Sequence, residues 1–245
     1  YDFFGYNNLT IFCTDGPQMP DHKQIYKQKA DAYERLISRE DYQGNLLQAI
    51  RRVISLEGID VVETGAGTGR LTCLLAPFVR SITAYDISPA MLKVARRKLK
   101  QTGLRNWKTG VTDHRSLPAG DASADLVISG WSLCYLVDWN QGNWQEEVCK
   151  GLAEMERVCN PGGMLIIIET QGTGFETPHP PDHLASYFEF LGKQGYQFTW
   201  FRTDYQFEST EEAHELTAFF FGEELAAQFS SNLLPECTGL WWKRM

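Results

Sequence analysis

The sequence predicts a single α/β domain with a mostly parallel, doubly wound sheet and helices on both faces. Apolar segments of strand length alternate with segments of helical periodicity from residue 60 to residue 169. The strand segments are apolar almost throughout, which is typical of parallel strands buried on both faces. A glycine-rich turn follows the first strand segment. The length of the chain, 245 residues, suits one such domain.

Two helices are expected before the sheet. The first 20 residues are rich in aromatic and turn-forming residues without a sustained period, so we expect an irregular arm there. Apolar residues then recur at helical spacing over residues 21–39 and again over 45–56.

The core elements alternate between strand and helix, except that the strands over 106–112 and 124–129 follow one another directly. The turn Asn160-Pro161-Gly162-Gly163 has Pro and Gly at the positions that a type II turn favours. The pattern changes beyond Thr170, and the two strands predicted there can close the sheet in antiparallel orientation. The predicted strands are 60–63, 81–86, 106–112, 124–129, 164–169, 196–207 and 239–243, and the predicted helices are 70–78, 89–101, 144–158, 182–192 and segments within 210–229.

Charge and composition favour a small-molecule partner. The net charge of −8 and a pI near 5.2 argue against a surface that neutralises nucleic-acid phosphates. No apolar run approaches the ~18 residues of a membrane span, so no membrane partner is expected. The six cysteines are scattered without a CxxC pair, which is typical of a reducing compartment and predicts a cytoplasmic protein.

The strongest local signal is the turn between residues 63 and 70, which carries Gly65, Gly67 and Gly69. Glycines let the backbone approach a ligand closely, and the N-terminus of the following helix adds a positive dipole. Arg70 stands where the dinucleotide pattern GxGxxG requires its last glycine, which argues against NAD. A tight strand-to-helix connection without a ligand is the alternative.

Asp86 supports the ligand interpretation. It ends the next predicted strand, 21 positions after Gly65, where an acidic residue can accept both hydroxyls of a ribose. Alone, Asp86 can instead cap the helix that begins at Pro89. Together the turn and the acid predict a site for an adenosyl group.

From Tyr26 to Glu169 the order of motifs resembles the class I methyltransferases that use S-adenosylmethionine (SAM), in particular small-molecule enzymes of the type 11/25 kind. The resemblance implies a seven-stranded Rossmann-like sheet, SAM as cofactor and S-adenosylhomocysteine as product. In this family the glycine turn holds the methionine end of SAM, an acidic residue acts nearby, a second acid binds the ribose, and further residues contact the adenine. The residues that match the glycine turn are Gly65, Ala66, Gly67 and Gly69, and Glu63 matches the acidic residue nearby. Asp86 matches the acid that binds the ribose. The residues that match the adenine contacts are Ile87, Ser88 and Asp113 with the adjacent His114.

The fourth strand of the family has a tip that faces the methyl group, and Ser129 and Gly130 match it. The tip lacks the Asn/Asp-Pro-Pro-aromatic motif, which argues against methylation of DNA or of glutamine. Thr64 departs from the usual residue type before the turn, and we expect no consequence. Tyr26 and Tyr33 resemble residues of the helix that closes over SAM, although core packing explains them equally well.

Methyl transfer from a sulfonium mainly requires alignment and exclusion of water, so acid–base residues are optional. His114, His179 and His183 are candidates for a base, each with an ordinary surface role as the alternative. Trp131 is expected to project toward the acceptor. Phe3, Phe4 and Tyr6 of the arm, with Phe175 and the glycines Gly172 and Gly174, are expected to form a mobile cover over the acceptor.

We therefore expect one domain over residues 1–245, with 1–44 as a lid, 45–170 as the cofactor-binding core and 171–245 on the substrate side. The predicted function is methyl transfer from SAM to a small molecule, without a metal site. An NAD-dependent oxidoreductase and a non-catalytic SAM-binding partner protein remain alternatives. The acceptor atom and the oligomeric state are left open.

Overall fold

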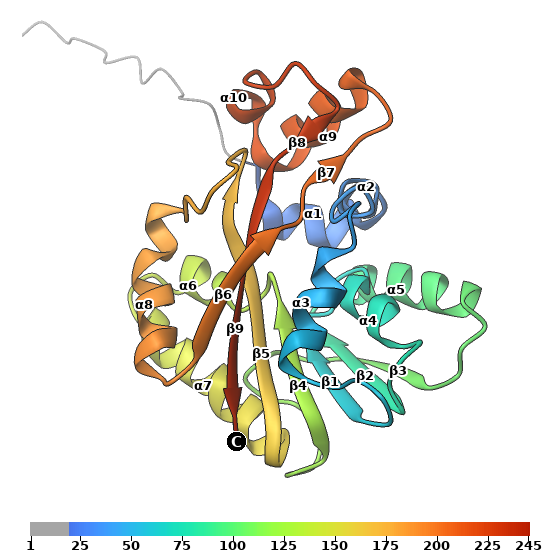
Figure 1. Cartoon of the computed structure of the whole chain (residues 1–245), viewed down its shortest axis with the longest axis vertical. Helices are drawn as coiled ribbons and strands as arrows, with labels where there is room; N and C mark the ends of the chain where they lie inside the picture. Colours follow the sequence, from blue (N-terminus) through green and yellow to red (C-terminus); the bar gives the residue numbers. More distant parts are fainter. Residues whose placement is uncertain (1–19) are drawn as a thin grey trace, which may run out of the picture.

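A computed structural model describes residues 20–245 and contains one seven-stranded sheet in the order β3-β2-β1-β4-β5-β9-β6. The first five strands in this order are parallel, and β9 runs antiparallel to both β5 and β6 (Figure 1). The predicted fold class is therefore confirmed. The strands are β1 (Asp60–Thr64), β2 (Ser81–Asp86), β3 (Trp107–Val111), β4 (Ala124–Gly130), β5 (Cys159–Thr173), β6 (Gln197–Arg202) and β9 (Glu236–Arg244).

Helices cover both faces of the sheet because successive strand residues point to opposite sides. Val61, Leu126 and Ile166 pack with α3 (Asn45–Val53) and α4 (Arg70–Leu75). Val127 and Leu165 pack on the other face, against α6 (Cys134–Trp139), α7 (Trp144–Val158) and α8 (Ala185–Lys193). Figure 1 shows α5 (Pro89–Gln101) beside α4.

A cover of small elements lies at the end of the sheet where the parallel strands finish (Figure 1, top). Leu36, Tyr205, Leu216 and Phe220 form its own apolar cluster. The ligands of doubly wound sheets bind at this carboxyl end, so the cover lies over the expected site. Its elements are α1 (His22–Gln28), α2 (Ala30–Ile37), α9 (Thr210–Phe221), α10 (Glu223–Ala226) and the small sheet of β7 (Tyr205–Gln206) and β8 (Leu233–Leu234).

The structure departs from the predicted elements mainly near this cover. Residues 21–39 form two helices because the backbone leaves helical geometry at Lys29 (φ −126°, ψ 33°). The predicted strand 196–207 divides into β6 and β7 at Thr203 and Asp204. The backbone N–H of Thr203 donates a hydrogen bond to the Glu236 backbone oxygen, and the Glu236 N–H donates one to Asp204 Oδ1. Helix α6 was not predicted, and a 3₁₀ turn (Asp182–Leu184) precedes α8. Gly162 has φ +81°, as a type II turn requires, but it lies within β5.

Two further sequence expectations concern the surroundings of the protein. In the part of the chain that the structure describes, no helix has the length and apolarity that a membrane crossing requires. Among residues 20–245, Cys73, Cys134, Cys149, Cys159 and Cys237 are free thiols, and the predicted reducing compartment remains a prediction. The expected arm, including Phe3, Phe4 and Tyr6, lies outside the described residues.

Asp41 organises the start of α3 from outside the helix. It has φ +60°, and its carboxylate accepts hydrogen bonds from the backbone N–H groups of Asn45 (2.8 Å) and Leu46 (3.1 Å). These are donors that the first turn of a helix otherwise leaves without a partner.

We expect Asp41→Ala to lower the free energy of unfolding by about 1–2 kcal/mol, because it removes this cap and places alanine at a positive φ. Asp41→Asn keeps an acceptor and tolerates the backbone geometry, so it should lose less than half as much. Urea denaturation of both variants measures the difference, and equal losses would contradict the capping role.

Candidate SAM-binding site

The glycine turn connects β1 to α4 with three residues in the left-handed region: Gly65 (φ +74°), Gly67 (φ +53°) and Gly69 (φ +78°). A Cβ on Gly65 would lie 1.9 Å from Ser132 Oγ, and one on Gly69 would lie 2.9 Å from Ala95 Cβ. These two glycines are therefore required for packing. A Cβ on Gly67 meets nothing nearer than 3.8 Å, so the middle of the turn borders open space that a ligand can use.

The Asp86 carboxylate is fixed directly beside that space. Its oxygens accept hydrogen bonds from the backbone N–H groups of Gly67 (2.8 Å) and Ser88 (2.7 Å). Burial raises the pKa of Asp86, and these two bonds counteract part of that increase. Each carboxylate oxygen can accept a further hydrogen bond, so the group remains able to bind ligand hydroxyls.

An apolar surface adjoins Asp86. Ile87 is 58% exposed, and Val111, which lies opposite Asp86 in the β2–β3 register, is 55% exposed. Exposed aliphatic side chains at two neighbouring strand ends suit the face of a purine ring. Ile87 is a contact predicted from the sequence, whereas Val111 is not. The position of Val111 at the end of β3, the strand that follows Asp86, could have indicated it.

Glu63 lies in β1, directly before the turn, and is 1% exposed. Its Oε2 accepts a hydrogen bond from Thr72 Oγ1 (2.5 Å), yet burial raises its pKa to about 8. Thr68 Oγ1, in the glycine turn, is buried without a hydrogen-bond partner in the described part of the chain. A buried acid that lacks a cation and a buried hydroxyl that lacks a partner both fit a polar, cationic ligand group.

The predicted tyrosines of the cover lie close to this site. Ser88 Oγ donates a hydrogen bond to the Tyr26 backbone oxygen (2.9 Å), and the Tyr26 and Tyr33 rings meet edge to face at 5.3 Å. The hydroxyls of Tyr26 and Tyr135 are hydrogen-bonded. Burial, with Glu40 as the next cause, raises the pKa of Tyr33. Both tyrosines thus pack in an aromatic cluster, and closure over SAM remains a prediction.

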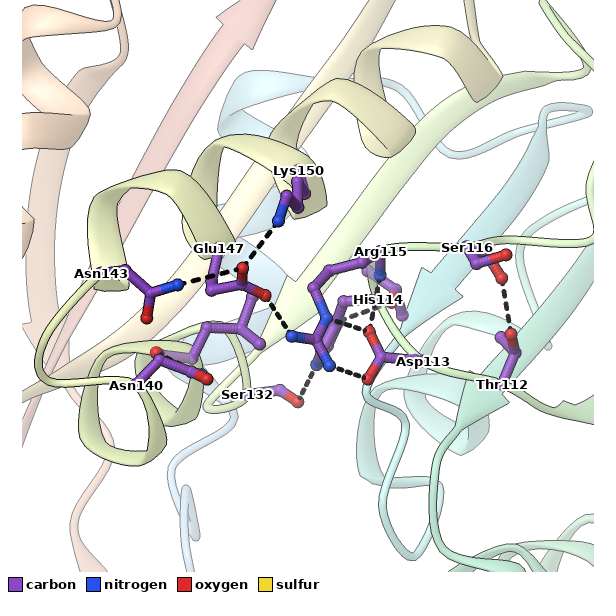
Figure 2. Close-up of polar contacts among 12 residues, drawn as sticks. Thr112, Asp113, His114, Arg115, Ser116, Ser132, Asn140, Asn143, Glu147 and Lys150 are labelled. Carbon is purple, nitrogen blue, oxygen red and sulfur yellow. Dashed lines mark hydrogen bonds and ion pairs between the residues drawn. The ribbon is translucent and has the colours of Figure 1, made fainter.

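His114 is held on both sides of its ring. Nδ1 lies 2.6 Å from Thr64 Oγ1. Nε2 lies 2.9 Å from Ser132 Oγ (Figure 2). Burial lowers the pKa of His114 to about 4, so the ring is neutral near pH 7. With both nitrogens engaged, this geometry favours a positioning role for His114 over that of a base.

Asp113 is bound by a neighbour instead of being open to a ligand. Its oxygens accept hydrogen bonds from Arg115 Nε and Nη2, both at 2.7 Å, and Arg115 also pairs with Glu147 (Figure 2). Arg115 accordingly lowers the pKa of Asp113. The contact between Asp113 and the adenine amino group remains a prediction. It requires that an Asp113 oxygen accept a hydrogen bond from the amino group in addition to that from Arg115.

Trp131 lies at the tip of β4, as predicted, with an unusual positive φ of 48°. Its backbone N–H donates a hydrogen bond to the Ile168 backbone oxygen (2.6 Å), and the Arg70 guanidinium lies 4.1 Å from the centroid of the Trp131 ring. Arg70 also forms a buried ion pair with Glu40 (2.6 Å). The ring is therefore clamped beside the start of α4, while Ser129 is fully buried with an unpartnered Oγ.

The other two histidines make their contacts elsewhere. His179 is exposed, its ring stacks on Phe175 at 4.2 Å, and its N–H donates a hydrogen bond to the Gln171 backbone oxygen. His183 pairs with Asp138 (3.4 Å). In the part of the chain that the structure describes, neither histidine bonds to the glycine turn. A catalytic role for His179 stays a prediction.

Glu169 is a residue that the sequence analysis did not single out. It is fully buried at the carboxyl end of β5, where its Oε1 accepts hydrogen bonds from the Cys134 backbone N–H (3.0 Å) and the Tyr187 hydroxyl (3.4 Å). Oε2 has no hydrogen-bond partner among the residues that the structure describes, and burial raises the pKa of Glu169 to about 7. An acid that ends an apolar strand next to the fourth strand was the available signal.

A hollow of about 480 Å³ lies at the opposite end of β5, between Arg52, Gln197 and Trp242. No residue of the predicted site lines it. It therefore takes no part in the site at the carboxyl end.

Comparisons with known proteins agree with the geometry. Residues 62–167 match a family model described as a methyltransferase domain. A demethylmenaquinone methyltransferase of Tropheryma whipplei (strain Twist) is 29% identical over 157 residues, which are 63% of this chain and 61% of that protein. The chain thus spans about three fifths of the length of this curated relative.

Solved structures share the fold. A SAM-dependent methyltransferase from Aquifex aeolicus has a TM-score of 0.53 at 18% identity, over 91% of this chain and 93% of that chain. The [4+2]-cyclase SpnF has a TM-score of 0.58 at 18% identity, over 94% and 98% of the two chains. At this identity the likeness concerns the fold alone, and SpnF shows that proteins named for another reaction use it.

The strand order, the glycine turn and the acid at the end of β2 define a doubly wound domain built to hold an adenosyl ligand. With the matched family model and these relatives, the chain is similar to SAM-dependent methyltransferases. The residues fit SAM, since the turn is open at Gly67 and a carboxylate stands beside it.

Gly67 and Gly65 give a matched test. We expect Gly67→Ala to fold with a loss of about 1–2 kcal/mol from its positive φ, while SAM affinity falls at least about tenfold because the methyl group enters the open space. Gly65→Ala should lose about 2–3 kcal/mol or more, because its Cβ collides with Ser132. Thermal unfolding and calorimetry with SAM measure the two effects, and unchanged SAM affinity in Gly67→Ala would exclude the turn as the binding surface.

His114 predicts a pH dependence of stability. The pKa is lowered from 6.5 to about 4 in the folded protein, so between these values only the unfolded chain takes up the proton. The neutral His114 therefore contributes about 3 kcal/mol to the free energy of unfolding above pH 6.5, and this contribution is lost as the pH falls to 4. Between pH 6.5 and 4, wild type should lose about this much more stability than His114→Gln in urea denaturation. Parallel curves would contradict a buried neutral imidazole.

Proposed function

We propose that this chain binds SAM and transfers its methyl group to a small molecule, with S-adenosylhomocysteine as the other product. The observation that carries the proposal is the Asp86 carboxylate, which is held 2.8 Å from the Gly67 N–H beside the open middle of the glycine turn. An acid in this position accepts ribose hydroxyls in doubly wound nucleotide-binding sheets.

The proposed contacts follow from the chemistry of each side chain. Asp86 accepts the ribose hydroxyls, and Ile87 and Val111 contact the adenine face. Glu63, whose pKa burial raises to about 8, becomes ionised when the cationic methionine end of SAM lies at the turn. Thr68 Oγ1 gains a partner there. The remaining predicted contacts, at Ala66, Ser88, Asp113, Ser129 and Gly130, belong to the same proposal.

SAM supplies a methyl group that its sulfonium already activates. The chain therefore has to align an acceptor with that methyl group and exclude water. We place the acceptor between the ends of β4 and β5 and the cover formed by α1, α2 and α9, where the aromatic cluster around Tyr26 and Phe220 offers an apolar surface. In this scheme residues 45–170 hold the cofactor, and residues 20–44 and 171–245 shape the acceptor side.

The acceptor class is inferred from charge and from the relatives. The net charge of −8 disfavours a nucleic acid. The relative from Tropheryma whipplei is named for demethylmenaquinone, and an aromatic quinol suits a site covered by aromatic rings. We therefore propose a small aromatic acceptor of this kind. An NAD-dependent reaction is disfavoured because Arg70 replaces the last glycine of the dinucleotide pattern.

We expect wild type to bind SAM and S-adenosylhomocysteine in calorimetry and not to bind NADH. Asp86→Ala should weaken SAM at least about tenfold, because hydrogen bonds to a charged acceptor contribute about 1.5–3 kcal/mol each. Asp86→Asn retains one oxygen and should lose less.

Asp60→Asn is the control, because Asp60 lies at the opposite end of β1 and pairs with Arg80. It should leave SAM affinity unchanged. NADH binding in place of SAM would contradict the proposal. Methyl transfer is then tested with a short-chain reduced analogue of demethylmenaquinone, and SAM binding without turnover on any acceptor would favour a non-catalytic partner protein.

A further inference from the structure

Two buried polar side chains lack partners next to each other at the carboxyl end of the sheet. Within residues 20–245, Glu169 Oε2 and Ser129 Oγ are both fully buried and have no hydrogen-bond partner. Ser129 pairs with Ile167 in the β4–β5 register, so Glu169 lies two positions further along the neighbouring strand. Both side chains lie on the α6–α8 face, because Val127 and Ile167 of the same alternation pack there.

The contacts of Glu169 fix one oxygen and leave the other available. Oε1 is held by the Cys134 N–H and the Tyr187 hydroxyl, which orient the carboxyl group. Such a group costs free energy unless its second oxygen meets a donor. The tip of β4 passes directly alongside, since the Trp131 N–H bonds to the Ile168 backbone oxygen one residue before Glu169.

We propose that Glu169 is the residue that binds a hydroxyl group of the methyl acceptor and takes up its proton during transfer. This rests on the proposed function and specifies its acceptor as a molecule with a weakly acidic O–H. A neutral hydroxyl enters a buried space without bringing a charge, and it supplies the donor that Oε2 lacks.

A phenolic acceptor gives up its hydroxyl proton as it receives the methyl group. The O–H bond breaks and its proton moves to Glu169 Oε2. The electron pair left on oxygen, or on the ring carbon conjugated with it, forms the new bond to the methyl carbon, while the pair of the broken S–C bond stays on sulfur. After attack by carbon, the ring C–H proton leaves to solvent and Glu169 returns its proton to the oxygen.

The surroundings of Glu169 support a single titrating base. Helix α6 presents the Cys134 thiol, the Tyr135 hydroxyl and the Asp138 carboxyl, and α8 presents the Tyr187 hydroxyl. Burial raises the pKa values of Cys134, Tyr135 and Tyr187 well above their usual ranges, so these groups stay neutral. The pKa of Glu169 is raised to about 7, mainly by burial and to a smaller extent by Asp138. A base in this range suits proton uptake near neutral pH.

The experiment measures kcat/KM against pH with the short-chain demethylmenaquinol analogue as acceptor, alongside SAM affinity by calorimetry. For wild type, kcat/KM should rise with pH to about 7 and then level. Glu169→Gln keeps an oxygen for Cys134 and Tyr187 but presents an amide N–H₂ in place of Oε2. It should bind SAM within about twofold of wild type, lower kcat at least about 100-fold and abolish the rise with pH.

Two further variants separate this role from a structural one. Tyr187→Phe removes a donor to the carboxylate, so it should move the rise to higher pH while the plateau persists. Glu236→Gln is the matched control, because Glu236 is also a buried acid with an unpartnered Oε2 and a pKa raised to about 8, but on β9. It should keep the wild-type pH profile. A wild-type profile in Glu169→Gln, or an unmoved rise in Tyr187→Phe, would overturn the proposal.

A binding arm keeps the test independent of turnover. Binding of 1-naphthol to the complex with S-adenosylhomocysteine, read by naphthol fluorescence, should weaken at least about tenfold in Glu169→Gln. Equal affinity in the two proteins, or no binding to wild type, would overturn the role of Glu169 even if SAM binds normally. Loss of SAM binding by wild type would instead contradict the proposed function.

Discussion

The close approach of backbone and side chains at the glycine turn is the constraint on which the site depends. Ser132 packs where a Cβ of Gly65 would lie, and Ala95 where a Cβ of Gly69 would lie. The first contact brings the segment after β4 against the end of β1, and the second brings α5 against α4. Only residues without a side chain allow both approaches together with positive φ. The remaining glycine, Gly67, is then free to border a ligand.

From this turn the polar contacts extend across the carboxyl end of the sheet. Ser132 bonds to His114, which bonds to Thr64, so the segment after β4 is tied to β1. On the other side Arg70 stacks on Trp131 and pairs with Glu40, which ties the cover to the same turn. Glu40 in turn accepts a hydrogen bond from Thr203 (3.0 Å) at the junction of β6 and β7. Cofactor side, strand tips and cover therefore form one connected unit.

The sequence predicted what periodicity and spacing determine. The helices over residues 89–101 and 144–158 and the strand over 81–86 agree with the structure residue for residue, because long amphipathic or apolar segments carry a strong signal. Asp86 was found from its distance to the glycines. Its hydrogen bond to the Gly67 N–H confirms that strand spacing places the two groups together. The antiparallel closure by β9 was also predicted correctly.

Tertiary contacts determine what the sequence did not reveal. Helix α6 has six residues and too little periodicity to stand out, and the break at Lys29 lies within a continuous amphipathic pattern. The unpartnered Oε2 of Glu169 and the two bonded nitrogens of His114 depend on residues that are distant in the sequence, such as Tyr187 and Thr64. The engagement of Asp113 by Arg115 concerns side-chain geometry, which a motif does not specify.

A crystal structure of the chain grown with S-adenosylhomocysteine tests the central claim most directly. We expect electron density for the ligand over Gly67, with both ribose hydroxyls within hydrogen-bond distance of Asp86 and the adenine between Ile87 and Val111. Density at another place on the sheet, or a ribose without contact to Asp86, would contradict it.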